Sequence, residues 1–284
     1  MASRVRAPRA GVALVRESDL ARELGQVGVR RSGVLLVHAS MKRLGYVMHG
    51  AEAVFSALRG LLGPEGTLLV PTFTGARTDP ACWTAPALPR SVWEETREAT
   101  PLFDPVHSLP EGMGGLATRV LFDPASRRSN HPLCSFAALG PHAEELLSEH
   151  DLLDPFGPKS PLAAARRLRA QVLLLGVDQR SNAALLHAQV LADAPAVRRR
   201  KGTFLAEVDG ERTWVRPERL PECSEGFGRI EDDLVSRGLV RVARVGDGTC
   251  RLMRMHPVVA HVEHCLRLRP EWVHCGRDAC RQCN

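Results

Sequence analysis

The chain has 284 residues and a mass of 31.1 kDa, which suffices for one large domain or two small ones with a core that needs no disulfide. Hydrophobic residues make up 44% of it and charged residues 25%, so the composition excludes a disordered chain. No apolar run approaches the ~18 residues that a membrane-spanning helix needs, which excludes a membrane span. The net charge of +6 comes from arginines interspersed with acidic residues, and this mixed pattern does not by itself indicate a nucleic-acid partner.

Residues 1–15 are predicted to form a basic arm, because their apolar patch is too short for the core of a signal peptide. Eight cysteines in a chain of this length and without such a signal favour a cytoplasmic protein over an extracellular disulfide scaffold.

Hydrophobic patterning predicts an alternation of helices and buried strands in the first part of the chain. The expected elements are, in order, a helix capped by Ser18 and ending near Gly25, a strand over 33–38, a helix over 50–62, a turn at 63–66 and a strand over 67–71. The strand–helix–strand order favours a parallel pair. Residues 75–112 are rich in Pro, Trp and Thr without periodicity, so we expect a functional loop on the substrate side.

The same pattern continues to about residue 200 and then changes. The expected elements are a helix that follows Met113-Gly-Gly and runs to about Phe122, a strand over 135–139, helices over 142–149 and 160–169, a strand over 171–177 and a helix over 182–192. Beyond them, Asp209-Gly210 predicts a hairpin between 202–208 and 211–217, followed by a helix near 225–237 and strands over 239–245 and 249–253. We therefore predict an α/β fold with a central, mostly parallel sheet flanked by helices and a smaller antiparallel α+β section toward the C-terminus. The expected organisation is an arm (1–15), a core (16–200), the α+β section sharing that core (201–255), and a helix with a cysteine-rich tail (256–284).

Several short motifs follow one another along the chain. They are Val37-His-Ala-Ser-Met-Lys-Arg-Leu-Gly-Tyr-Val47, Gly66-Thr-Leu-Leu-Val-Pro-Thr-Phe-Thr74, Asp79-Pro-Ala-Cys-Trp83, Phe103-Asp-Pro105, Met113-Gly114, Arg128-Ser-Asn-His-Pro132, Ser135-Phe-Ala-Ala138, Pro155-Phe-Gly157, Ser160-Pro-Leu162, Leu174-Leu-Gly176 and Leu186-His187. Each is weak alone, but together and in this order they resemble the aminoglycoside 3-N-acetyltransferase family over about residues 15–220. The resemblance implies transfer of an acetyl group from acetyl-CoA to an amine.

The resemblance places the family's catalytic histidine at His187, just past the carboxyl end of a buried strand, where open α/β sheets bind ligands. An attacking amine must lose a proton, and imidazole suits this general-base role because its pKa lies near neutral pH. The alternative is a helix histidine without a chemical role. The sequence departs from the family's His-x-x-Glu element, since Val190 stands at the glutamate position, and the usual upstream threonine is absent. Gln189 and Ser181 are candidate replacements, and Asp178 is expected either to orient His187 or to cap the following helix.

The resemblance also implicates the turn after the first buried strand in binding CoA. The cofactor-binding candidates are His38, Ser40, Met41, Lys42, Arg43, Met113, Gly114 and His131. Backbone N–H groups and basic side chains at such a turn can hold phosphates, although an ordinary surface turn would have a similar sequence. Asp79 and Asp104 of the long loop are the candidate carboxylates for a polycationic acceptor, or they cap their own loop.

Four cysteines crowd into the last twenty residues. Cys275, Cys280 and Cys283 lie within nine positions, and Cys280 and Cys283 form a Cys-x-x-Cys pair, a spacing typical of structural zinc sites. We choose Cys265 as the fourth ligand, with His274 or His256 next. A disulfide-forming tail and a frayed end are the alternatives.

The sequence thus predicts an acetyl-CoA-dependent N-acetyltransferase acting on a primary amine of an aminoglycoside-like or other natural product, with a structural zinc. One alternative is a catalytically silent homologue that binds acyl-CoA, since the residues expected around the histidine are missing. Another is a nucleic-acid or protein interaction module that uses the basic ends and the cysteines. A homodimer is one possible state, and the sequence does not decide it.

Overall fold

The computed structural model describes residues 14–83, 86–193, 202–221, 223–277 and 280. Residues 1–13 of the expected basic arm and Cys283 of the tail therefore lie outside the described residues. Leu14–Val15, the end of the expected arm, forms the short strand β1, which pairs in parallel with β3 (Tyr46–Val47).

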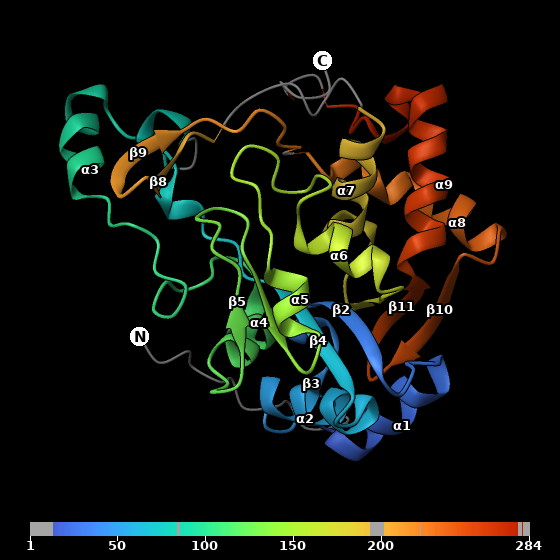
Figure 1. Cartoon of the computed structure of the whole chain (residues 1–284). Coiled ribbons are helices and arrows are strands. Elements are labelled where there is room, and N and C mark those ends of the chain that lie inside the picture. Colours follow the sequence, from blue (N-terminus) through green and yellow to red (C-terminus); the bar gives the residue numbers. More distant parts are fainter. Residues whose placement is uncertain (1–13, 84–85, 194–201, 222, 278–279, 281–284) are drawn as a thin grey trace.

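A seven-stranded sheet forms the centre of the molecule (Figure 1). Its strands are, in spatial order, β10 (Val240–Val245), β11 (Gly248–Arg254), β7 (Gln171–Leu175), β2 (Gly33–Ala39), β4 (Gly66–Pro71), β6 (Phe136–Leu139) and β5 (Arg127–Arg128). β2 pairs in parallel with both β4 and β7, and the pairs toward both edges are antiparallel. The central strands are unbroken Val and Leu runs because side chains on both of their faces are buried.

Helices cover both faces of this sheet (Figure 1). Leu35 and Val37 of β2 pack on one face, in a core shared with α1 (Glu17–Val27), α2 (Ala51–Leu62) and α4 (Gly114–Leu121). Val34 and Leu36 point to the other face, whose core is shared with α5 (Ala143–Leu147), α6 (Pro161–Arg167), α7 (Ala183–Leu191), α8 (Glu231–Ser236) and α9 (Met255–Leu268). The alternation follows from the two-residue period of a strand. The α/β class and the parallel β2–β4 pair expected from the sequence are confirmed.

The antiparallel part near the C-terminus divides into two. β8 (Phe204–Val208) and β9 (Glu211–Val215) form a separate hairpin, and its turn residues Asp209 and Gly210 have φ angles of 52° and 83°, the left-handed conformations that a tight hairpin turn requires. β10 and β11 instead extend the main sheet, because β11 pairs with β7.

Several local expectations are corrected. α1 begins at Glu17 rather than after Ser18, because the Asp19 carboxylate accepts a hydrogen bond from the Arg16 backbone N–H (3.1 Å). The helix expected over 225–237 is a 3-10 helix, η7 (Glu225–Ile230), followed by α8. The described part of the long loop contains a helix, α3 (Trp93–Ala99), and three single 3-10 turns, η2 (Gly75–Arg77), η3 (Pro80–Cys82) and η4 (Arg90–Val92).

The strand order reverses beside β2, because the chain passes from β2 to β4 on one side and later returns to β7 on the other. In open α/β sheets, ligands bind at the carboxyl ends of the strands at such a reversal. None of the helices in the described ranges is both long and apolar enough to cross a membrane.

Candidate active site

A cavity of about 720 Å³ opens at the carboxyl end of β2. Its walls come from the ends of β2 and β4, the start of α4, the segment between β7 and α7, and Leu220, Pro221 and Ser224. The cavity therefore lies at the strand-order reversal, where the fold predicts a ligand.

Most of the residues expected to bind CoA line this cavity. They are His38, Ser40, Met41, Lys42, Met113 and Gly114. Ser40 leads from β2 into the short 3-10 helix η1 (Met41–Arg43), and Gly114 and Gly115 begin α4 on the facing wall. Because the first N–H groups of a helix have no partner within it and carry partial positive charge, this wall suits an anion. The side chain of Arg43 is exposed and does not line the cavity.

His131 has a different role from the one expected. It is fully buried away from the cavity, and its Nδ1 accepts hydrogen bonds from the backbone N–H groups of Leu133 and Cys134 (3.1 and 3.0 Å). Its ring packs against those of His150 and Phe204. His131 therefore stabilises its own loop rather than contacting a ligand in the cavity.

His38 is the histidine that lines the cavity among the described residues. Its Nε2 accepts a long hydrogen bond (3.4 Å) from the N–H of Ala183, the first residue of α7. Burial lowers the pKa of His38 to about 4, and the positive end of a helix nearby also disfavours a charged ring. At neutral pH His38 is an uncharged imidazole.

His187 lies one helical turn beyond Ala183, which lines this cavity, but His187 itself does not line it. Its ring Nδ1 lies 2.6 Å from the backbone oxygen of Phe156, and burial lowers its pKa to about 4. It lines a second cavity of about 400 Å³, together with Arg166 and His256. His187 thus does not line the main cavity, although Phe156, its hydrogen-bond partner, does.

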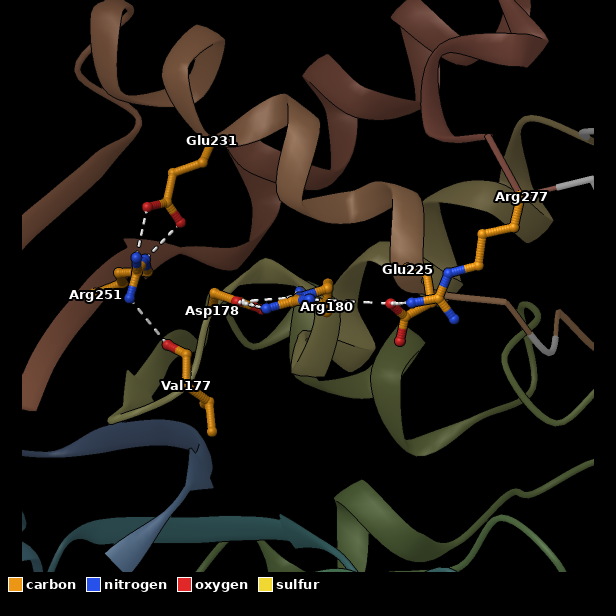
Figure 2. A network of polar contacts seen from close by, with 7 residues as sticks. All are labelled: Val177, Asp178, Arg180, Glu225, Glu231, Arg251 and Arg277. Atoms are coloured by element: carbon orange, nitrogen blue, oxygen red, sulfur yellow. Dashed lines mark hydrogen bonds and ion pairs between the residues drawn. The ribbon is translucent and has the colours of Figure 1, made fainter. Parts of the chain in front are cut away.

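Asp178 contacts Arg180 rather than His187. Its carboxylate accepts the Arg180 backbone N–H (3.0 Å), capping the 3-10 turn η5 (Gln179–Ser181), and pairs with the guanidinium at 2.6 Å. These contacts with Arg180 lower the pKa of Asp178. Figure 2 shows that Arg180 also faces Glu225 (3.9 Å), which in turn pairs with Arg277 (2.8 Å).

The two aspartates expected to bind the acceptor serve their own loop. Asp79 caps η3 through the Ala81 N–H (2.8 Å) and receives two hydrogen bonds from Arg97 (3.0 Å each). Asp104 accepts the Val106 N–H (2.7 Å) and lies 2.6 Å from His107 Nδ1, contacts that lower its pKa. Neither lines the cavity. Among the described lining residues there are two cations, Lys42 and Arg180, and no carboxylate.

Part of the cavity wall was not predicted from the sequence, including Gly115, Arg180, Asn182 and Ser224. Arg180 and Asn182 follow β7, so the rule that ligands bind at strand ends could have identified them. Ser224 had no such signal, because its position depends on how the chain returns from the β8–β9 hairpin.

The cysteines of the expected zinc site are only partly brought together. The Sγ atoms of Cys275 and Cys280 form a group with Cys223 in which all three lie within 4.8 Å of one another. Cys265 is not in this group, because it lies on α9 with its Sγ 3.7 Å from His261 Nε2. Cys223, which is distant in sequence, takes the place expected for Cys265.

Comparison with known proteins relates the chain to a family of acetyltransferases. The family model for aminoglycoside 3-N-acetyltransferases matches residues 36–267. Aminoglycoside N(3)-acetyltransferase VII of Streptomyces paromomycinus is 35% identical over 270 residues, covering 87% of this chain and 92% of the relative.

Two solved structures share the fold. AAC-IIIb with CoASH bound is 27% identical, with a TM-score of 0.77 over 90% of this chain and 98% of that one. A mutant of AAC(3)-IVa in complex with a gentamicin is 30% identical, with a TM-score of 0.77 over 93% of each chain. The chain therefore belongs to the aminoglycoside 3-N-acetyltransferase family, whose members are acyltransferases.

Proposed function

We propose that the protein transfers an acetyl group from acetyl-CoA to a primary amine of an aminoglycoside-like or other natural-product acceptor. The observation that carries the proposal is the cavity at the strand-order reversal, which combines a basic rim, the N-terminus of α4 and an uncharged imidazole. The CoASH complex of AAC-IIIb supports CoA as the acetyl donor, and the gentamicin complex of AAC(3)-IVa supports an aminoglycoside-like acceptor.

The residues on one wall fit CoA. CoA supplies the acetyl group as a thioester and carries phosphates, which suit the Lys42 side chain and the backbone N–H groups at Gly114 and Gly115. Val37, Val70 and Phe73 provide apolar surface deeper in the cavity, which limits access of water to the reacting carbonyl.

The amine side uses His38 in this proposal. The amine nitrogen forms a bond to the thioester carbon, the carbon–sulfur bond breaks, and the proton that the amine loses ends on the departing sulfur. His38 accepts that proton and passes it on, since its imidazole is uncharged at neutral pH and lines the cavity.

Cys134 also lines the cavity, and it bears on the choice between direct and covalent transfer. Burial raises the pKa of its thiol far above neutral pH, so the sulfur stays protonated and is a poor nucleophile. This favours direct attack of the amine on the thioester over an acyl-enzyme intermediate.

Steady-state release of CoA thiol, measured with aminoglycosides and simpler primary amines, tests the proposal. His38→Gln is expected to lower kcat by about 10²–10⁴-fold, the usual contribution of a general base. His187→Gln is the matched control, because Gln can still donate to the Phe156 carbonyl oxygen, and it should keep near-native turnover. Full activity of the His38 variant together with loss in the His187 variant would contradict the assignment.

A second candidate is a family member that binds acyl-CoA without acetylating an amine. The position of His187 away from the main cavity favours it, and so does the lack of a carboxylate among the described lining residues to orient His38. Calorimetry separates the two functions: CoA binding without thiol release for any amine would support the silent homologue.

A further inference from the structure

Three cysteine thiols meet beside the cavity wall. The Sγ atoms of Cys223, Cys275 and Cys280 all lie within 4.8 Å of one another, and all three side chains are partly buried. Cys223 precedes η7, whereas the other two follow the short 3-10 helix η8 (Pro270–Val273). A disulfide can join only two sulfurs, but a metal ion can bind all three.

Contacts that do not involve sulfur hold the two segments together. A β-carbon at Gly226 would lie 1.8 Å from the backbone oxygen of Val273, so only glycine allows η7 to approach η8 this closely. Arg229 Nη2 donates to the Cys275 carbonyl oxygen (3.2 Å), and Arg277 pairs with Glu225 (2.8 Å). The fold itself therefore brings the thiols together.

We infer that Cys223, Cys275 and Cys280 bind a structural zinc ion. Tetrahedral zinc with Zn–S bonds of about 2.3 Å separates its sulfur ligands by about 3.8 Å. The sulfur atoms of the three cysteines lie within 4.8 Å of one another, and small side-chain rotations bring them to that spacing. Thiolates are soft ligands that favour zinc, whereas calcium and magnesium require oxygen. The guanidinium of Arg229, bonded to the Cys275 carbonyl oxygen, favours the negative charge of a thiolate cluster.

None of the three cysteines lines the cavity. A zinc ion bound by them would therefore have a structural rather than a catalytic role.

The zinc site would fix one wall of the cavity. Leu220, Pro221 and Ser224, which flank Cys223, line the cavity. Figure 2 shows the connection from the tail: Arg277 pairs with Glu225, and Glu225 faces Arg180, another lining residue. Lys42 and Gly114, the residues proposed to bind CoA, belong to other elements. We thus infer that zinc stabilises the wall of the cavity opposite in role to the CoA-binding wall, namely the wall to which Lys42 and Gly114 do not belong.

Metal content tests the site independently of activity. Full-length protein purified without a metal-affinity tag should contain about one zinc per chain by plasma mass spectrometry, the content of one thiolate site. Cys223→Ser and Cys280→Ser should lose it and lower the melting temperature. Cys265→Ser is the matched control and should retain zinc, because this thiol is outside the group. Absence of metal in the wild type, or equal zinc in Cys223→Ser and wild type, would overturn the inference.

Cobalt substitution covers the case in which the serine variants do not fold. Cobalt added to chelator-treated wild-type protein should give the visible bands of tetrahedral coordination and a thiolate-to-cobalt charge-transfer band. A spectrum of octahedral cobalt without that band would overturn the inference.

The expected effect of zinc on the cavity wall rests on the proposed function, and it is measured by kinetics rather than by metal content. Cys280→Ser is expected to raise KM for the amine several-fold while leaving KM for acetyl-CoA unchanged. Equal changes in the two KM values would show that zinc does not fix this wall of the cavity. An inactive wild-type protein would refute the proposed function. In that case the zinc content would still show whether the metal site exists.

Discussion

At the scale of the residue, position along α7 separates His187 from the main cavity. Ala183, the first residue of the helix, lines that cavity, whereas His187 lies one turn further along and lines the second cavity. The sequence motif places His187 on α7 but does not show which of the two cavities it lines. His38, on a strand whose carboxyl end opens into the cavity, supplies the imidazole instead.

Lys42 and Arg43 provide a matched test of the CoA wall, because the two are adjacent, exposed cations of which only Lys42 lines the cavity. Lys42→Ala should raise KM for acetyl-CoA about tenfold, the effect of losing a charged hydrogen bond worth about 1.5 kcal/mol. Arg43→Ala should leave it unchanged. Steady-state kinetics with acetyl-CoA as the varied substrate measures KM for both variants. Equal effects of the two substitutions would contradict the proposed contact between Lys42 and a phosphate.

At the scale of the element, the buried strands and the Asp209-Gly210 hairpin could be predicted because each has a local pattern: unbroken apolar runs for the strands, and a turn that needs left-handed residues for the hairpin. The CoA turn after β2 could also be predicted, from its motif and its place after a strand. Contacts between distant segments, such as Cys223 with Cys275 or Asp79 with Arg97, could not be predicted from the sequence, because they depend on how those segments pack.

Arg128 holds the long loop against the sheet. Its Nε donates to Thr72 Oγ1 (3.1 Å) and Ser135 Oγ (3.0 Å), and its Nη1 donates to the Ser108 carbonyl oxygen. Burial lowers the pKa of Arg128 to about 10. Arg128→Met should reduce the free energy of unfolding by about 2–3 kcal/mol, since buried oxygens lose a charged donor.

The control for this change is its neighbour. Arg127 is mostly exposed and has a 3.7 Å ion pair with Glu144, so Arg127→Met should cost less than about 1 kcal/mol. Urea unfolding measures both, and equal losses would show that Arg128 does not hold the loop.

At the scale of the whole molecule, buried histidines set the response to acid. Burial lowers the pKa values of His38, His131 and His187 to about 4 from the ordinary value of 6.5. Between these two pH values the unfolded chain binds protons that the folded chain does not. The free energy of unfolding should therefore decrease as pH falls from 6.5 toward 4, by about 1.4 kcal/mol per pH unit for each histidine, and these groups should have no effect above pH 7.

Urea unfolding at pH 7.5, 6 and 5 measures this dependence. His187→Gln should reduce proton uptake on unfolding at pH 5 by about one proton, because one histidine no longer titrates. A pH dependence identical to that of the wild type would show that His187 is not kept neutral by the fold.

The cavity at the end of β2 is proposed to acetylate an amine with His38 as the base, and every other functional prediction depends on this step. Mass spectrometry of primary amines incubated with acetyl-CoA and the full-length protein tests it most directly. We predict an amine that gains one acetyl group with the wild type and with His187→Gln, and little or none with His38→Gln. No acetylated product from any amine, in protein that binds CoA by calorimetry, would contradict it.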